Sequence, residues 1–302
     1  MSRKYTGWPV QILPYWTMTL LIFAAFLFLS ESGQAANTSK ETLSYFSSDY
    51  GESRSKFLQS AEMVGASIES YRNPVNGADG SPLYTDVAII GPDNAPKVLV
   101  LGSGTHGVEG FSGSAIQTGL LREGIADQLS PDLKLILIHA INPYGFAHRR
   151  RVNEDNVDVN RNFIDHTKSY PVNPGYEALV DVIEPAQLSW WQDIVAHLKI
   201  YWYRISEGKE KLKIAINQGQ YTHPGGLFYG GNSASWSSKT FTKILQKHAS
   251  TARQVVYLGF HTGLGSYGNA EVIMNVPSSS DAYLHAIECW GDNARGQTDA
   301  PT

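Results

Sequence analysis

The segment Lys97-Val-Leu-Val-Leu-Gly-Ser-Gly-Thr-His-Gly-Val-Glu-Gly110 leads from an apolar run into a predicted helix. The apolar run is typical of a buried strand, and the apolar spacing over residues 112–123 predicts the helix. A second apolar run, residues 134–141, follows. Strand, helix and strand in this order indicate a parallel pair of strands joined by a right-handed crossover.

Strands and helices alternate along the rest of the chain. Apolar runs predict further strands over residues 86–91 and 254–260, and the first lies one short turn before Lys97, so we expect those two strands to be adjacent. Residues 73–82 read as a loop. Helical periodicity is found over residues 52–71, 177–205, 237–249 and 281–290. The pattern predicts an α/β fold with a mixed, largely parallel sheet flanked by helices.

The composition is that of an ordinary globular protein. The chain has 302 residues, of which 42% are hydrophobic and 17% charged. A formal net charge of −4 gives no basic field, so no nucleic-acid partner is expected. Cys289 is the single cysteine, which excludes an intrachain disulfide and a cysteine-rich metal site. Trp190, Trp191 and Trp202 are expected to pack against the sheet.

The N-terminus has the features of an export signal. Arg3 and Lys4 precede the apolar residues 12–29, and small residues stand at Gly33 and Ala35. We expect residues 1–35 to be a signal peptide and the remainder to be exported, periplasmic or secreted. The alternative is an uncleaved anchor, because about 18 apolar residues can span a bilayer. Membrane contact is expected only through this segment, if it is uncleaved.

His106 and Glu109 form an H-x-x-E pair where the strand meets the helix. Residues three apart in a first helical turn lie on one face, so the imidazole and the carboxylate can bind one ion. Zinc takes such donors, and a catalytic zinc uses three protein ligands and an open water position. His261 is the candidate third ligand, because it follows strand 254–260 at the sheet edge where functional groups gather.

Gly102-x-Gly104-x-x-Gly107 in the same segment also matches the dinucleotide-binding fingerprint. That interpretation requires an acidic residue about 20 positions later, at the end of the next strand. Glu123 has the spacing but falls within the predicted helix, and the strand starting at Lys134 ends without an acid. A nucleotide site is therefore the weaker interpretation.

An arginine-rich segment, residues 142–163, begins at the end of the third strand. Its Arg149, Arg150, Arg151 and Arg161 could bind an anionic group through their planar guanidinium groups. A run of charges is usually only a solvated face. Beside a metal pair, however, it favours a pocket for a carboxylate or an oxyanion.

Five motifs follow one another along the chain: His106-x-x-Glu109, Asn142-Pro-x-Gly145, Arg151-x-Asn153, Asp158-x-Asn160-Arg161-Asn162-Phe163 and Phe260-His261-Thr-Gly263. In this order they resemble the motifs of zinc carboxypeptidases, a superfamily that includes succinylglutamate desuccinylase and aspartoacylase-like enzymes. Residues 218–231 and 261–268 resemble a bacterial carboxypeptidase-like branch of unknown function. We expect one zinc carboxypeptidase-like domain over residues 45–292, followed by a polar tail, residues 293–302.

The resemblance implies a role for each matching residue. Zinc would be bound by the three candidate ligands named above. Arg151 would polarise the scissile carbonyl and steady the oxyanion, and Asn160 and Arg161 would hold the terminal carboxylate of the substrate. The implied activity is zinc-dependent hydrolysis of amide bonds in a peptide, with deacylation of an N-acyl amino acid as the alternative.

Two features depart from the family pattern. The family usually has an Asp two residues before the third ligand, and this chain has Gly259, a loss that can cost about 10- to 100-fold in affinity or activity. The family's general base is a Glu on a later strand, and we expect the C-terminal strands that would carry it to be missing. Glu271 and Glu288 do not match its context. The expectation is a truncated, weakly active enzyme, with a non-catalytic zinc- or peptide-binding remnant as the alternative.

Overall fold

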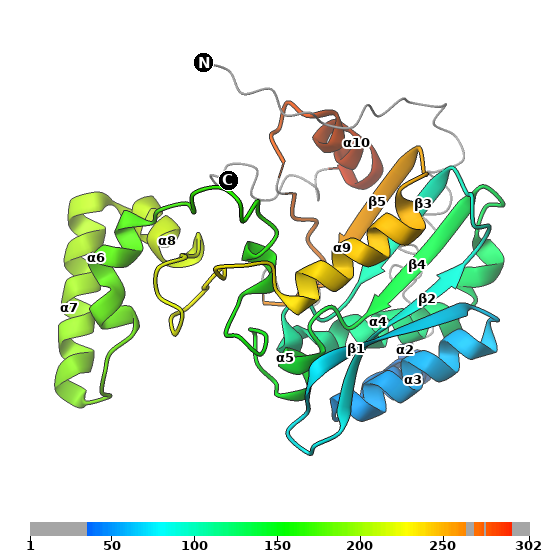
Figure 1. Cartoon of the computed structure of the whole chain (residues 1–302), viewed down its shortest axis with the longest axis horizontal. Helices are drawn as coiled ribbons and strands as arrows, with labels where there is room; N and C mark the ends of the chain where they lie inside the picture. The colour runs from blue at the N-terminus through cyan, green and yellow to red at the C-terminus, as the bar shows by residue number, and fades with distance from the viewer. Residues whose placement is uncertain (1–34, 264–268, 275, 292–302) are drawn as a thin grey trace.

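A computed structural model describes residues 35–263, 269–274 and 276–291. Its centre is a five-stranded sheet with the order β1-β2-β4-β3-β5 (Figure 1). The strands are β1 (Ser67–Asn76), β2 (Pro82–Ile90), β3 (Lys97–Gly102), β4 (Leu133–His139) and β5 (Gln254–Gly259). β3 pairs in parallel with β4 and β5, whereas β1 with β2 and β2 with β4 are antiparallel. The predicted α/β class, a mixed sheet flanked by helices, is confirmed.

Helices precede, connect and follow these strands. They are α2 (Ala35–Tyr45), α3 (Tyr50–Met63), α4 (Gly110–Arg122), α5 (Pro143–Ala147), α6 (Pro174–Ile183), α7 (Trp190–Glu207), α8 (Lys209–Asn217), α9 (Trp236–Ala249) and α10 (Asp281–Trp290). Many begin at a residue whose side chain accepts a hydrogen bond from the first turn, as at Asp49, Ser189 and Ser280. Such caps satisfy backbone donors that have no partner within the helix.

The core lies on both faces of the sheet. Along β4, Ile136 and Ile138 pack on one face in a cluster that includes Ile244 of α9. Leu135 and Leu137 pack on the other face in a cluster formed with α3 and α4. Figure 1 accordingly shows α9 on the near side of the strands and α4 behind them. Because all these β4 side chains are fully buried, truncating one to Ala costs about 2–5 kcal/mol.

The loop predicted over residues 73–82 is shorter, because β1 continues to Asn76 and β2 begins at Pro82, and three other predictions of local structure are wrong. The helix predicted over residues 52–71 ends at Met63, because Gly65 adopts a φ of 68° and β1 begins at Ser67. β2 and β3 are not adjacent, since β4, with its apolar centre Leu135–Ile138, lies between them and pairs with both. β5 is not a buried strand but an edge strand, on which Val255 and Tyr257 are exposed.

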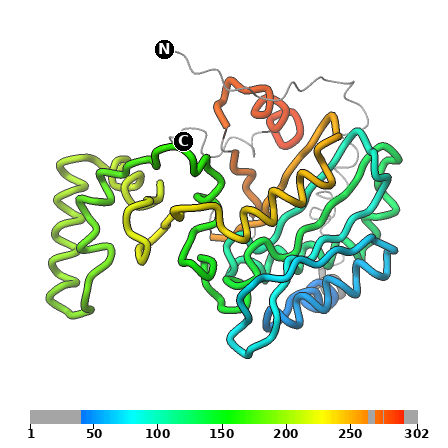
Figure 2. The backbone as a smooth tube through the Cα atoms, in the orientation of Figure 1, coloured from blue at the N-terminus to red at the C-terminus, as the bar shows by residue number. Residues whose placement is uncertain are grey.

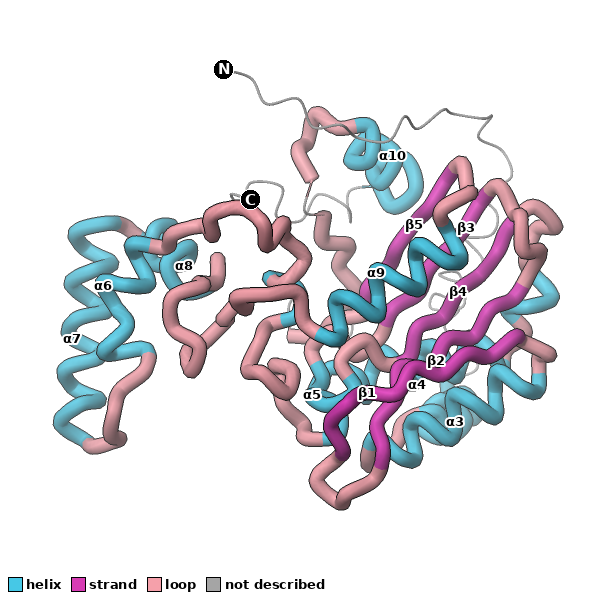
Figure 3. The backbone as a smooth tube through the Cα atoms, in the orientation of Figure 1, coloured by secondary structure: helices cyan, strands magenta, loops and turns pink. Residues whose placement is uncertain are grey.

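Helices α6, α7 and α8 form a separate unit beside the sheet, on the left of Figures 2 and 3. The expected packing of the tryptophans against the sheet is wrong. Trp190, Trp191 and Trp202 lie on α7, where they are 75%, 59% and 64% exposed.

Within the part of the chain that the structure describes, no helix has the length and apolarity needed to cross a membrane.

Several predicted segments lie outside the described residues. These are residues 1–34 of the predicted signal peptide, residues 264–268 of the segment 261–268 that resembles the bacterial branch, and the predicted tail, residues 293–302. α2 begins at Ala35, the predicted last residue of the signal.

Candidate metal centre

The site forms at the sheet edge where the parallel strands end. The chain leaves β3 at Gly102 and reaches His106 four residues later, whereas His261 stands two residues after the end of β5. Gly102 and Gly259 are paired in the parallel ladder, and Phe260 N donates to Gly102 O at 2.9 Å. The sheet register therefore brings the two histidines together, as carboxyl ends of parallel strands do.

The three predicted ligands are brought together. His106 Nδ1 lies 3.2 Å from Glu109 Oε1, and His261 Nδ1 lies 2.6 Å from Glu109 Oε2. The two imidazole centroids are 4.9 Å apart. One ligand atom from each residue lies within 4.8 Å of the other two. His106 and Glu109 are buried, while the His261 side chain is 34% exposed, which leaves one side of the cluster open to solvent.

Gly107 allows the turn between His106 and Glu109 to approach α5. A Cβ at Gly107 would overlap the backbone carbonyl carbon of Gly145, so only glycine fits. The turn is also tied to the arginine-rich segment, because Val108 N donates to Arg150 O at 3.1 Å. The close approach thus fixes Glu109 and brings the arginines to the same edge.

Asp158, for which the sequence suggested no role of its own, is the buried centre of the site. Its Oδ1 lies 3.2 Å from His106 Nε2, and its Oδ2 accepts hydrogen bonds of 3.0 Å from both Arg151 Nε and Arg161 Nη1. A carboxylate on the second nitrogen of a histidine fixes the ring orientation and raises its basicity as a metal ligand. Its position in the D-x-N-R motif was the available signal.

The charges of the cluster stabilise one another. Burial alone would raise the pKa of Glu109, but hydrogen bonds from His106 and His261 outweigh it and lower the pKa to about 2. Burial likewise opposes ionisation of Asp158, yet contacts with His106 and the two arginines lower its pKa. For His106, burial lowers the pKa, and the carboxylates of Asp158 and Glu109 raise it above its ordinary value. A positive charge at this position is therefore favoured, whether a proton or a metal ion supplies it.

The donor set fits zinc. Two ligands of a tetrahedral zinc ion lie about 3.4 Å apart, given bond lengths of about 2.1 Å. His106 Nδ1 and Glu109 Oε1 are near this separation at 3.2 Å. His261 stands closer, at 2.6 Å, and would move outward by less than about 1 Å to share an ion. Two histidines and one glutamate are a common set of protein ligands for a catalytic zinc.

Phe228 supports both arginines of the site. The guanidinium carbons of Arg151 and Arg161 lie 5.0 and 4.9 Å from the centroid of its ring, within cation–π distance. Phe228 has a φ of 53°, which is rare for a bulky residue and costs about 1–3 kcal/mol. Residues held in strained conformations concentrate at functional sites, so Phe228 joins the candidate site residues that the sequence missed.

The two predicted substrate-binding residues, Asn160 and Arg161, and the predicted catalytic residue, Arg151, differ in exposure and in hydrogen bonding. Asn160 is exposed, and its backbone N–H donates to Asp158 Oδ1 at 3.1 Å. Arg161 is mostly buried, donates to Asp158 and to Asn217 O, and has its Nε buried without a hydrogen-bond partner in the described structure. Arg151 has more room for a ligand, because 36% of its side chain is exposed. The roles assigned to these three residues remain predictions.

A family model described as "Protein of unknown function (DUF2817)" matches residues 46–301. The chain belongs to this DUF2817 family. A search of curated proteins gives no match.

Among solved structures, the DUF2817 chain is similar to carboxypeptidase A from Helicoverpa armigera, with a TM-score of 0.43 and 13% identity over 78% of this chain and 50% of that one. For glutaminyl cyclase from Tannerella forsythia the TM-score is 0.29, with 10% identity over 78% and 84% of the two chains. A Zn-dependent exopeptidase from Parabacteroides distasonis gives a TM-score of 0.26, with 10% identity over 86% and 89%. The chain thus spans about half the length of the carboxypeptidase. None of these weak likenesses assigns an activity to it.

Gly259 stands where the resemblance expects an Asp. A Cβ there would lie 2.9 Å from the Tyr257 hydroxyl, so the tyrosine of β5 occupies the space beside the third ligand. In the part of the DUF2817 chain that the structure describes, the only hydrogen bond of the His261 side chain is the one to Glu109. His261 is therefore the least constrained of the three candidate ligands.

The described residues also bear on the general base. Within them, the hydrogen bonds and ion pairs of the cluster involve only two carboxylates, Glu109 and Asp158. Glu271 and Glu288 are exposed. Each of the two carboxylates in the cluster already has positively charged partners, so neither is free to accept a proton at neutral pH.

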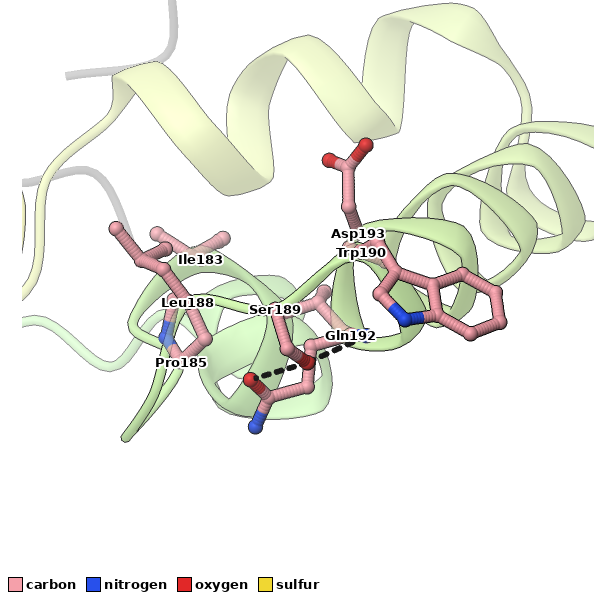
Figure 4. Close-up of a pocket in the computed structure, with 9 residues that line it drawn as sticks. Ile183, Pro185, Leu188, Ser189, Trp190, Gln192 and Asp193 are labelled. Carbon is pink, nitrogen blue, oxygen red and sulfur yellow. Dashed lines mark hydrogen bonds between the residues drawn. The ribbon is translucent and has the colours of Figure 1, made fainter.

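A groove elsewhere in the DUF2817 chain is not part of this site. It lies between the end of α6 and the start of α7 and is lined by Ile183, Pro185, Leu188, Trp190 and neighbouring residues (Figure 4). None of the candidate site residues lines it.

Proposed function

We propose that this chain is a zinc-dependent hydrolase of amide bonds that resembles a metallocarboxypeptidase. The observation that carries the proposal is the convergence of His106, Glu109 and His261 at an open sheet edge, with the guanidinium of Arg151 beside them. Arg151 Nη1 lies 3.7 Å from Glu109 Oε1, so a carbonyl group that reaches the cluster also reaches the arginine.

His106, Glu109 and His261 would hold the ion, and Asp158 would keep the His106 ring in the orientation that presents Nδ1. When bound, zinc acts as a Lewis acid on the carbonyl and acidifies bound water. Asp158 and Phe228 hold Arg151 so that its remaining N–H groups are directed toward the developing oxyanion. Such preorganised donors are the usual source of transition-state stabilisation in acyl transfer.

The proposed substrate carries an amide bond close to a free carboxylate. Arg161 and the exposed Asn160 lie on the same short turn next to Asp158, which supports a binding site for that carboxylate. A peptide with a free C-terminus and an N-acyl amino acid both have this chemistry. We place the peptide first, because the order of the motifs resembles carboxypeptidases.

A second function, binding of zinc or a peptide without catalysis, is favoured by one observation. Within the described residues, no carboxylate with a free lone pair and an ordinary pKa contacts the cluster. A general base typically contributes about 10²- to 10⁴-fold to the rate. If no other residue supplies this base, hydrolysis is slow or absent and binding remains.

We also propose that the protein is exported, because residues 1–35 have the features of a signal peptide.

The test combines metal analysis with hydrolysis. Zinc content and affinity are measured for the full chain and for His106→Ala, Glu109→Gln and His261→Ala, with the exposed His197→Ala as the matched control. Hydrolysis is then followed with an N-blocked dipeptide that has a free carboxylate, with its C-terminal amide and with an N-acetyl amino acid.

We expect about one zinc in wild type and the control, and loss of zinc in the three variants. Preference for the free-carboxylate dipeptide supports a carboxypeptidase, and preference for the N-acetyl amino acid supports a deacylase. Zinc binding without turnover of any substrate supports the binding function. Unchanged zinc content in all three variants would refute the site.

A further inference from the structure

Helix α7 presents a broad apolar surface to solvent. Eight of its apolar residues are exposed, and we call them the α7 stripe: Trp190, Trp191, Ile194, Val195, Leu198, Tyr201, Trp202 and Ile205. The opposite side of the helix already has its partners, since Ala196, Ile200 and Tyr203 are partly buried within the unit formed with α6 and α8. The stripe therefore takes no part in the packing of α7 against α6 and α8.

The side chains of the stripe are ordered around the helix. Successive residues of an α-helix are rotated by about 100°, which places Ile194, Leu198 and Ile205 in the middle of the stripe. The four aromatic rings flank this aliphatic centre, with Trp190 and Tyr201 on one side and Trp191 and Trp202 on the other, where Val195 lies just beyond them. Aliphatic residues in the centre with Trp and Tyr at the edges are typical of a helix that lies flat at a membrane interface.

Two basic side chains of α7 lie beside the stripe. By the same rotation, Arg204 lies outside the Trp190 edge of the stripe and Lys199 outside the Val195 edge. Glu207 lies on the side of the helix almost opposite the centre of the stripe. Around the helix, Asp193 is slightly farther from that centre than Arg204 is. The basic side chains are thus nearer to the plane of a bound bilayer than the acidic ones, although Lys199 also pairs with Asp181 at 2.5 Å.

A second copy of the chain fits the stripe less well. A specific protein interface uses about 20–30 residues from each partner, and the stripe offers eight exposed apolar residues on one helix. The stripe itself contains no charged or amide side chain that could fix the register of a partner. A lipid surface needs neither the larger area nor a defined register.

We propose that the α7 stripe binds the surface of a membrane containing anionic lipids, with α7 lying in the interface. The contact does not involve the apolar residues 12–29, so it would hold the protein at a bilayer even after removal of a signal peptide. It also does not depend on the proposed zinc chemistry.

The test uses a probe at single positions of the full chain, so that attachment through the N-terminus is distinguished from contact through α7. In a Cys289→Ser background, which removes the only cysteine, an environment-sensitive fluorophore is attached to Leu198→Cys. Matched controls carry it at Glu207→Cys, on the opposite side of α7, or at Val172→Cys, an exposed apolar residue outside α7. Vesicles contain phosphatidylcholine alone or with phosphatidylglycerol, and some contain a lipid-borne quencher.

We expect a blue shift and lipid quenching at position 198 and at neither control position, with tighter binding to the anionic vesicles that weakens in high salt. Introducing Ile194→Glu into the labelled protein should weaken vesicle binding through α7 by about tenfold or more. No quenching at position 198, or equal quenching at position 172, would overturn the proposal. A concentration-dependent blue shift without vesicles would overturn it in favour of a second copy.

Discussion

Replacing Asp158 by Asn tests the internal logic of the metal centre, because it removes a charge without changing the shape of the side chain. The carboxylate contacts His106 Nε2 at 3.2 Å and two guanidinium groups at 3.0 Å. Asn keeps one acceptor oxygen, so at least one of these contacts is replaced by an N–H group that faces another donor. Whichever way the amide is oriented, His106 Nε2 loses its negatively charged partner.

Two magnitudes follow from this geometry. Loss of a carboxylate that orients a metal-bound histidine costs about 10- to 100-fold in metal affinity. Removing one partner of a buried ion pair costs about 3–5 kcal/mol of stability, because Arg161 is left without its counter-ion and Arg151 keeps only Glu109, at 3.7 Å. A domain of ordinary stability, about 5–15 kcal/mol, remains folded at room temperature after such a loss. Zinc affinity can therefore be measured on the folded variant.

The assay is competition for zinc against a chromophoric chelator, with thermal unfolding of the same samples. Asp165→Asn is the matched control, since Asp165 makes an exposed ion pair with Lys168 at 2.8 Å and does not touch the site. We expect a loss of zinc affinity for Asp158→Asn and no change for the control. Wild-type zinc affinity in a folded Asp158→Asn protein would show that Asp158 does not support His106, and the proposed centre would be wrong.

Three further predictions concern stability and positioning. Gly107→Ala should cost about 1–3 kcal/mol or more in the free energy of unfolding, measured by urea denaturation, and should lower the zinc content, because the new methyl group overlaps the backbone of α5. Phe228→Asn tolerates the positive φ and should leave thermal stability nearly unchanged, while two lost cation–π contacts lower kcat/KM by roughly 5- to 30-fold. Burial lowers the pKa of His139 to about 4, so the unfolded chain binds a proton first as the pH falls. The contribution of His139 to stability should therefore be constant above about pH 6.5 and fall by up to about 3 kcal/mol toward pH 4, a loss that His139→Phe should remove in urea titrations at several pH values.

The sequence predicted those elements whose apolar pattern is local and unambiguous. β3 and α4 were identified because an apolar run ends in a glycine-rich turn followed by helical spacing, and their parallel crossover to β4 followed from general topology. Residues 64–71 were misassigned because Val64 and Ile68 continue the helical spacing of α3. Only the left-handed conformation of Gly65 separates the helix from β1, and a single glycine in a sequence does not predict the end of a helix.

For the site, spacing and strand position were sufficient to select His106, Glu109 and His261 as one group. Asp158 stands in the D-x-N-R motif, but the sequence does not show that it is the partner of His106, because the two are 52 residues apart and their contact depends on how the loop after α5 folds back. Phe228 was missed for a similar reason. Nothing in its sequence neighbourhood shows that its backbone is strained or that its ring lies under two arginines from another segment.

The tryptophans of α7 show where sequence reasoning reaches a physical limit. Periodicity reveals that a helix has an apolar face, but the same face serves equally well against a sheet, a second protein or a lipid. The usual assumption, that large aromatic residues fill the core, fails here because α6 and α8 cover only the side that carries Ala196, Ile200 and Tyr203. Eight apolar side chains are left outside, at a cost in hydration that folding alone does not recover. A partner that removes this surface from water would recover that free energy, and the arrangement of rings and charges around the helix favours a membrane as that partner.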